Sequence, residues 1–151
     1  MAYTHSKYEV QMQGIQPSTA PVSGHHGVDL LVTGVVATWG PGFVPHIVRG
    51  VGVIPSLGAV RSNTVPINFI LDSTTPGTAT ECFSLDLPTT VTTANMAVYY
   101  QPTYTIEVKP GMNFSASVTT AATAGTSARI MLYVEPRWET PANVTTMIAT
   151  T

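Results

Sequence analysis

Residues 129–135 read "RIMLYVE", and this stretch decides the fold. Its side chains form two alternating sets, one aliphatic and one mixed: Ile130, Leu132 and Val134, then Met131, Tyr133 and Glu135. Successive side chains of a β-strand point to opposite faces, so this alternation predicts a strand with one buried face. A loop of small neutral residues, 119–127, precedes the strand, and Pro136 ends it.

The same period of two recurs on both sides of the loop. It predicts strands near 30–38, 43–54, 66–71, 80–87, 104–109, 113–119 and 128–135. No segment carries an apolar helical stripe, and the twelve glycines and twelve prolines fall between the runs. Several strands separated by turn signals, without helices, predict an all-β antiparallel sandwich or barrel.

The predicted core is the set of inward-facing side chains on these strands. It comprises Ile67, Phe69, Phe83, Leu85, Ile106, Val108, Phe114, Val118, Ile130, Leu132 and Val134. Tyr104 is placed inward as well, by the same alternation. The glycines of "RGVGVIPS", residues 49–56, predict a β-bulge or a close approach to the backbone.

The two ends of the chain are interpreted as lying outside the core, because residues 1–28 have no clear core periodicity and residues 136–151 are rich in proline and threonine. Residues 1–28 are interpreted as an extended N-terminal arm, 29–135 as the sandwich domain, and 136–151 as an extended C-terminal tail. The arm contains Pro17 and Pro21, and we expect it to dock on a sister subunit or another partner. Its apolar residues are the candidate anchors: Tyr3, Tyr8, Val10, Met12 and Ile15.

Charge is scarce, at 9% of residues with a net charge of −2, where soluble domains average roughly 25%. This favours a surface that other protein covers. The scattered basic residues argue against nucleic-acid binding, and no apolar run is long enough to span a membrane. The N-terminus lacks a secretory pattern, and the single Cys82 forms no internal disulfide, so we expect synthesis in the cytoplasm.

No catalytic or metal-binding constellation is evident, so the chain is predicted not to be an enzyme and to need no cofactor. His25 and His26 are adjacent and would point apart, although a symmetry axis could gather several copies. Cys82 is interpreted as a small apolar filler. A pair of glycosidase carboxylates from distant strands stays open as an alternative.

Aromatic side chains leave two interpretations open. Trp39, Tyr99, Tyr100, Tyr104 and Trp138 could line a carbohydrate groove, or they could be core or interface anchors. We take Trp39 and Trp138 as further candidate interface residues.

The sequence "TYTIEVKPGMNFSASVTTAATAGTSARIMLYVEPRW", residues 103–138, resembles the jelly-roll part of small tailed-phage capsid decoration (cement) proteins. "WGPGFVPHIVRGVGVI", residues 39–54, resembles a segment of similar virion proteins. The resemblance implies a jelly roll, often a homotrimer, that binds the major capsid protein on the outer capsid surface. The arm and the tail would then reach a neighbour or the shell.

Three functions follow as hypotheses. The first is capsid decoration, and the second is a carbohydrate-binding sandwich on a phage head fibre or spike. The third is a cupin-like enzyme. Such an enzyme needs a cluster of histidines and a carboxylate as metal ligands, and the spacing in this sequence does not supply one. A solvent-open aromatic groove would favour the second over the first, and aromatics buried between subunits would favour the first.

Overall fold

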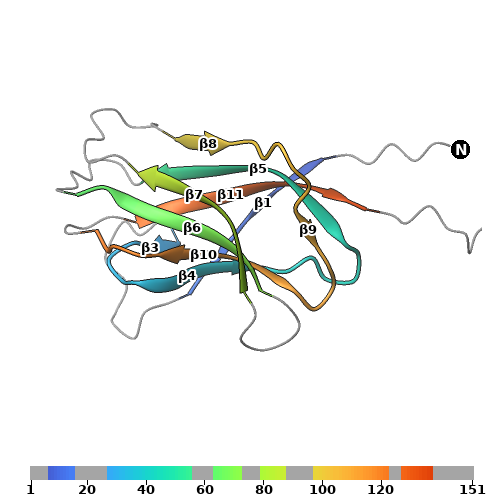
Figure 1. Cartoon of the computed structure of the whole chain (residues 1–151), viewed down its shortest axis with the longest axis horizontal. Helices are drawn as coiled ribbons and strands as arrows, with labels where there is room; N and C mark the ends of the chain where they lie inside the picture. The colour runs from blue at the N-terminus through green and yellow to red at the C-terminus, as the bar shows by residue number, and fades with distance from the viewer. Residues whose placement is uncertain are drawn as a thin grey trace, which may run out of the picture.

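The computed structural model describes residues 7–15, 27–55, 63–72, 79–87, 97–122 and 127–137. These residues form a β-sandwich of two antiparallel sheets, with no helix among them (Figure 1). The first sheet has the order β1 (Tyr8–Gln11), β11 (Ser127–Pro136), β5 (His46–Pro55) and β8 (Val98–Tyr100), with β3 (Val28–Asp29) beside β11 and β9 (Glu107–Val108) beside β5. The second has the order β2 (Gln13–Gly14), β4 (Gly34–Trp39), β10 (Asn113–Val118), β6 (Val65–Asp72) and β7 (Ala79–Leu87). The all-β antiparallel sandwich is therefore confirmed.

The core lies between the two sheets. Every residue of the predicted core is buried, so the alternation identified the inward faces correctly. Its aromatic centre is Phe69, whose ring stacks on Phe83 at 4.9 Å and on Phe114 at 5.8 Å between ring centroids. Phe83 in turn stacks on Tyr100 at 4.2 Å, and this contact joins the second sheet to the first.

Two predicted strands begin later in the structure. The segment 30–38 is interrupted after β3, because the Asp29 carboxylate accepts a hydrogen bond from the Leu31 backbone N–H at 2.8 Å and makes a local turn. The segment 43–54 becomes a strand only at His46, because residues 40–45 form a loop. In both segments the turn residues are as apolar as the strand residues beside them, so the sequence pattern does not show where the strand begins.

The predicted strand 104–109 is also shorter, because only Glu107 and Val108 pair with β5. The inward placement of Tyr104 is wrong, since its side chain is 47% exposed. Its hydroxyl instead donates a hydrogen bond to the Cys82 carbonyl on β7. Among the strands that the structure describes, β7 pairs with β6 alone, and their register shifts by one residue at Cys82. Tyr104 thus covers part of an open sheet edge, which would otherwise invite pairing with other chains.

We expect Tyr104→Phe to lower the free energy of unfolding by about 0.5–1.5 kcal/mol, the net value of one hydrogen bond. Urea denaturation measures this as a lower midpoint with an unchanged slope. A midpoint equal to that of the wild type would show that the hydroxyl does not hold this edge.

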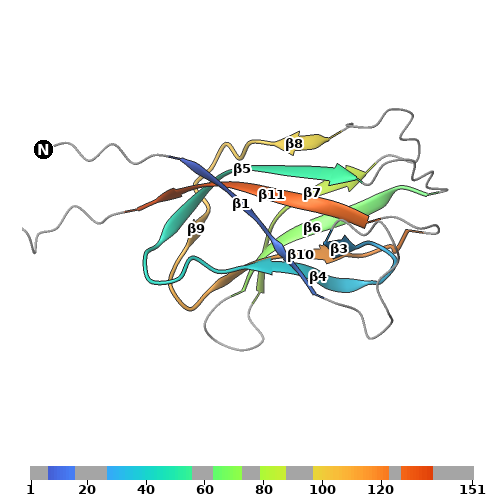
Figure 2. The ribbon, with the colours of Figure 1, turned by 180° about the vertical axis from the view of Figure 1, so that it is seen from behind.

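The N-terminal segment differs most from expectation. β1 pairs with β11 in the first sheet, and β2 pairs with β4 in the second, so the chain crosses the open edge between the sheets (Figure 2). The Met12 N–H donates to the Ile130 carbonyl at 2.9 Å, and the Met12 side chain has no exposed surface. The prediction that this segment docks outside its own sandwich is therefore wrong for residues 8–14. The physical reason is that the two layers leave an edge of the core open, and Met12 closes it.

Candidate functional site

One end of the sandwich gathers both the first and the last described strand. β1 starts at Tyr8 and β11 finishes at Pro136, in adjacent positions, and the loop between β4 and β5 lies at the same end (Figures 1 and 2). The Arg137 backbone N–H donates to the Pro45 carbonyl at 2.7 Å, and the Arg137 side chain forms an ion pair with Glu107. We call this the terminal end of the molecule.

The β4–β5 loop presents Phe43 at the terminal end. This side chain is 100% exposed, and the loop around it reads Gly40-Pro41-Gly42-Phe43-Val44-Pro45. Each proline fixes its own φ, and Gly42 occupies a left-handed conformation with φ of 73°. Phe43 is therefore a large apolar group on a restrained loop. A phenylalanine that the described residues leave uncovered is an expected feature of a protein–protein anchor.

Behind this loop, His46 ties the N-terminal strand to the sandwich. Its Nδ1 lies 2.7 Å from the Val44 carbonyl, which can only accept, so Nδ1 carries the proton and Nε2 accepts from the Tyr8 hydroxyl. The Trp39 ring meets His46 edge-on, with centroids 5.5 Å apart. His46 is buried, and both of its ring nitrogens have hydrogen-bond partners, so it acts as a structural histidine in β5.

The candidate interface residues from the sequence fall into different environments. Tyr8 and Ile15 are 44% and 45% exposed, whereas Val10 and Trp39 are half-buried against the core or its margin. Met12 belongs to the core and cannot be an interface anchor. Tyr3 and Trp138 lie outside the described residues. Sequence reasoning missed Phe43, although the Gly-Pro-Gly breaker before it was a signal for a loop.

The loop of small neutral residues, 119–127, lies at the opposite end, between the end of β10 and the start of β11. Its described part packs on its own chain: the Ala122 N–H donates to the Leu30 carbonyl at 2.8 Å, and Asn63 Nδ2 donates to the Ala121 carbonyl at 2.9 Å. Residues 123–126 lie outside the described part. Among the described residues, the most exposed large apolar side chain is Phe43 at the terminal end.

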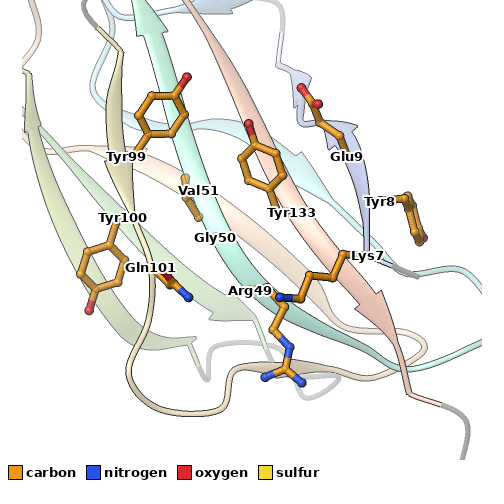
Figure 3. A pocket seen from close by; sticks show the side chains of 10 residues that line it. All are labelled: Lys7, Tyr8, Glu9, Arg49, Gly50, Val51, Tyr99, Tyr100, Gln101 and Tyr133. Atoms are coloured by element: carbon orange, nitrogen blue, oxygen red, sulfur yellow. The ribbon is translucent and has the colours of Figure 1, made fainter. Parts of the chain in front are cut away.

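A second surface feature is an open groove of about 590 Å³ on the outer face of the first sheet (Figure 3). Its floor is the β5 backbone at Gly50 and Val51. Tyr133 of β11 is the register partner of Gly50, and Tyr99 of β8 is the partner of Gly52. We call this feature the tyrosine groove.

The glycines of β5 make room for these rings. A Cβ atom on Gly52 would lie 2.8 Å from Tyr99 Cε1, and one on Gly50 would lie 3.3 Å from Tyr133 Cδ2. The predicted close approach at these glycines is confirmed, and the predicted bulge is found beside them, where the pairing shifts at Arg49. The rings can lie against the strand because no side chain occupies the space.

Polar groups surround the tyrosine groove. Lys7 and Glu9 come from the start of the chain, Gln101 follows β8, and Arg49 projects from the bulge. Arg49 Nε donates to Glu135 at 2.7 Å, which holds the guanidinium at the rim.

The pKa of the Tyr133 phenol is raised above 10.0 by burial, and to a lesser extent by Glu9 and Tyr99. This phenol therefore stays neutral near pH 7 and can both donate and accept hydrogen bonds.

Within the described residues, no three His, Cys, Asp or Glu side chains group as metal ligands. Cys82 is half-buried, and burial raises the pKa of its thiol, which makes the reactive thiolate a minor form. No helix in the described part of the chain is long and apolar enough to cross a membrane. The two surface features that stand out among the described residues are the exposed Phe43 at the terminal end and the tyrosine groove.

Comparisons with protein-family models and with curated proteins find no match for this chain.

Proposed function

We propose that the chain is a structural virion protein that decorates a phage capsid. In this proposal it binds the outer surface of the major capsid protein as a homotrimer and stabilises the shell, after synthesis in the host cytoplasm. The resemblance of residues 39–54 and 103–138 to small decoration proteins suggests the virion. The fully exposed Phe43 at the terminal end is the observation that carries the binding role.

We further propose that the sandwich is a jelly roll. Its eight strands would be β3, β4, β5, β6, β7, β8, β10 and β11, in chain order. One sheet then contains β3, β11, β5 and β8, which are the first, eighth, third and sixth of these strands. The other contains β4, β10, β6 and β7, which are the second, seventh, fourth and fifth. This alternation between two sheets suits the jelly-roll arrangement, which is used by viral capsid proteins and lectins. It therefore supports the proposal of a jelly roll.

The terminal end suits a decorating role for physical reasons. Phe43 would bury its ring in a partner at little entropic cost, because the prolines and the loop hydrogen bonds already restrain its backbone. Lys7 and Arg137, the first and last described residues, both lie at this end beside the paired strands β1 and β11. In a trimer, binding of one copy would raise the effective concentration of the other two at the capsid, so three modest contacts would give a high overall affinity.

The experiment compares the wild-type chain with Phe43→Ser for binding to capsids that lack the protein, by co-sedimentation. We expect Phe43→Ser to weaken binding at least tenfold, since a buried aromatic anchor contributes on the order of 1.4 kcal/mol or more. The free energy of unfolding should stay within about 0.5 kcal/mol of the wild type, because the side chain is fully exposed.

Leu31→Ser is the matched control. Leu31 is also an exposed apolar residue, at 37%, but it follows β3 at the opposite end of the sandwich. It should bind capsids as the wild type does. Equal binding by Phe43→Ser and the wild type would exclude the terminal end as the contact surface.

A further inference from the structure

The tyrosine groove has a composition that the capsid-binding role does not explain. Tyr99 is 64% exposed, although it lies in a β-strand and its ring covers Gly52. Tyr133 and Tyr99 stand on the same face of the sheet, on either side of β5, with their hydroxyls turned the same way (Figure 3). Because β8 and β11 flank β5, the backbones that carry the two rings are about two strand spacings apart, roughly 9.5 Å. We call the two rings, which lean over the β5 glycines, the Tyr99–Tyr133 platform.

The rim of the groove carries hydrogen-bond donors and acceptors, and its positive and negative side chains are equal in number. Lys7 and Arg49 are the cations, Glu9 lies at the register position opposite Tyr133, and Glu135 pairs with Arg49. With two positive and two negative side chains, the groove offers no net charge to an anion such as a phosphate or a sulfated chain. Gln101 and the two phenols add neutral hydrogen-bonding groups.

These features select a ligand that has an apolar face and a polar edge but no charge. A pyranose ring has both: its axial C–H groups form an apolar face, and its hydroxyls lie around the edge. Partly positive C–H groups are attracted to the negative face of an aromatic ring. The groove volume of about 590 Å³ lies within the range of small-ligand sites, roughly 300–1,000 Å³.

We propose that the tyrosine groove binds a neutral glycan, with a pyranose ring stacked on the Tyr99–Tyr133 platform and its hydroxyls bonded to Glu9, Arg49 and Gln101. The site lies on the sheet face, whereas Phe43 is at the terminal end, so one molecule could bind a capsid and a glycan together. Glycan binding does not rest on the capsid role and would hold if that role were absent.

The test uses the full-length chain on an array of neutral oligosaccharides of glucose, galactose, mannose and N-acetylglucosamine. Titration calorimetry then gives the dissociation constant for the best of them. We expect at least one neutral glycan to bind, and Tyr99→Ala to weaken that binding at least tenfold. Circular dichroism should show an unchanged strand spectrum, because Tyr99 is mostly exposed.

Gly52→Ala is a second variant that keeps both tyrosines. Its new Cβ would lie 2.8 Å from Tyr99 Cε1, so the ring must move off the strand and glycan affinity should fall. Phe43→Ser is the control and should bind the glycan normally. With capsids we expect the opposite result: Tyr99→Ala should bind as the wild type does, and Phe43→Ser should bind more weakly. Failure of the glycan proposal can therefore be distinguished from failure of the capsid proposal.

Three results would overturn the glycan site. They are the absence of binding to every neutral oligosaccharide, equal affinity for wild type and Tyr99→Ala, and a preference for sulfated glycans or nucleotides included on the same array.

Discussion

Replacing Phe69 with Ala is expected to lower the free energy of unfolding by about 3–5 kcal/mol. Phe69 has no exposed surface, and its ring lies between Phe83 and Phe114 on the neighbouring strands. Removing it leaves a cavity and also removes two stacking contacts, each worth about 0.5–1.5 kcal/mol beyond the buried area. Equilibrium denaturation in urea measures the loss.

Asn68→Ala is the matched control for this experiment. Asn68 is the preceding residue of β6, so its side chain points to the opposite face, and it is only partly buried. Its effect should stay below about 1 kcal/mol. If Phe69→Ala does not fold, Phe69→Leu should still fold with a smaller loss. A loss below about 0.5 kcal/mol for Phe69→Ala would contradict the position of the aromatic centre.

The second large effect is expected at Met12. Met12→Ala should cost about 2–5 kcal/mol, because the side chain is fully buried where the chain crosses between the sheets. For the same reason, deletion of residues 2–16 should destabilise the whole sandwich rather than remove a separate arm. The measurement is again the urea midpoint, at an unchanged slope for the point variant.

Gln13→Ala serves as the control in the same segment, since Gln13 is exposed and its backbone pairing with β4 is retained. It should change the stability by less than about 0.5 kcal/mol. A Met12→Ala variant as stable as Gln13→Ala would restore the interpretation of the segment as an arm outside the core.

Local alternation predicted the faces of the main strands but not the segments held by distant contacts. In residues 80–87 and 129–135, the period of two gave both the strand and its buried face, because those strands pair with neighbours over most of their length. Tyr104 follows the same period, yet its segment leaves the sheet, and its position depends on the carbonyl of Cys82. No local pattern contains that information.

Two further features carried signals that could have been used. Residues 8–13 alternate as Tyr, Glu, Val, Gln, Met and Gln, which is a strand pattern in a segment interpreted as an arm. The tyrosine groove depends on β8 and β11 lying on either side of β5, which only the folded topology shows. Glycines at 50 and 52 in an otherwise β-branched strand indicated a close approach, but not that tyrosine rings would make it.

Capsid binding is the central proposal, and the number of copies bound tests it most directly. The mass of the full-length protein in solution would first be measured by light scattering. One chain has a mass of 16.0 kDa, so a trimer gives about 48 kDa. The protein would then be titrated onto capsids that lack it and sedimented. We predict saturable binding with a bound copy number divisible by three. A protein that stays in the supernatant at every concentration tested, whatever its mass in solution, would contradict it.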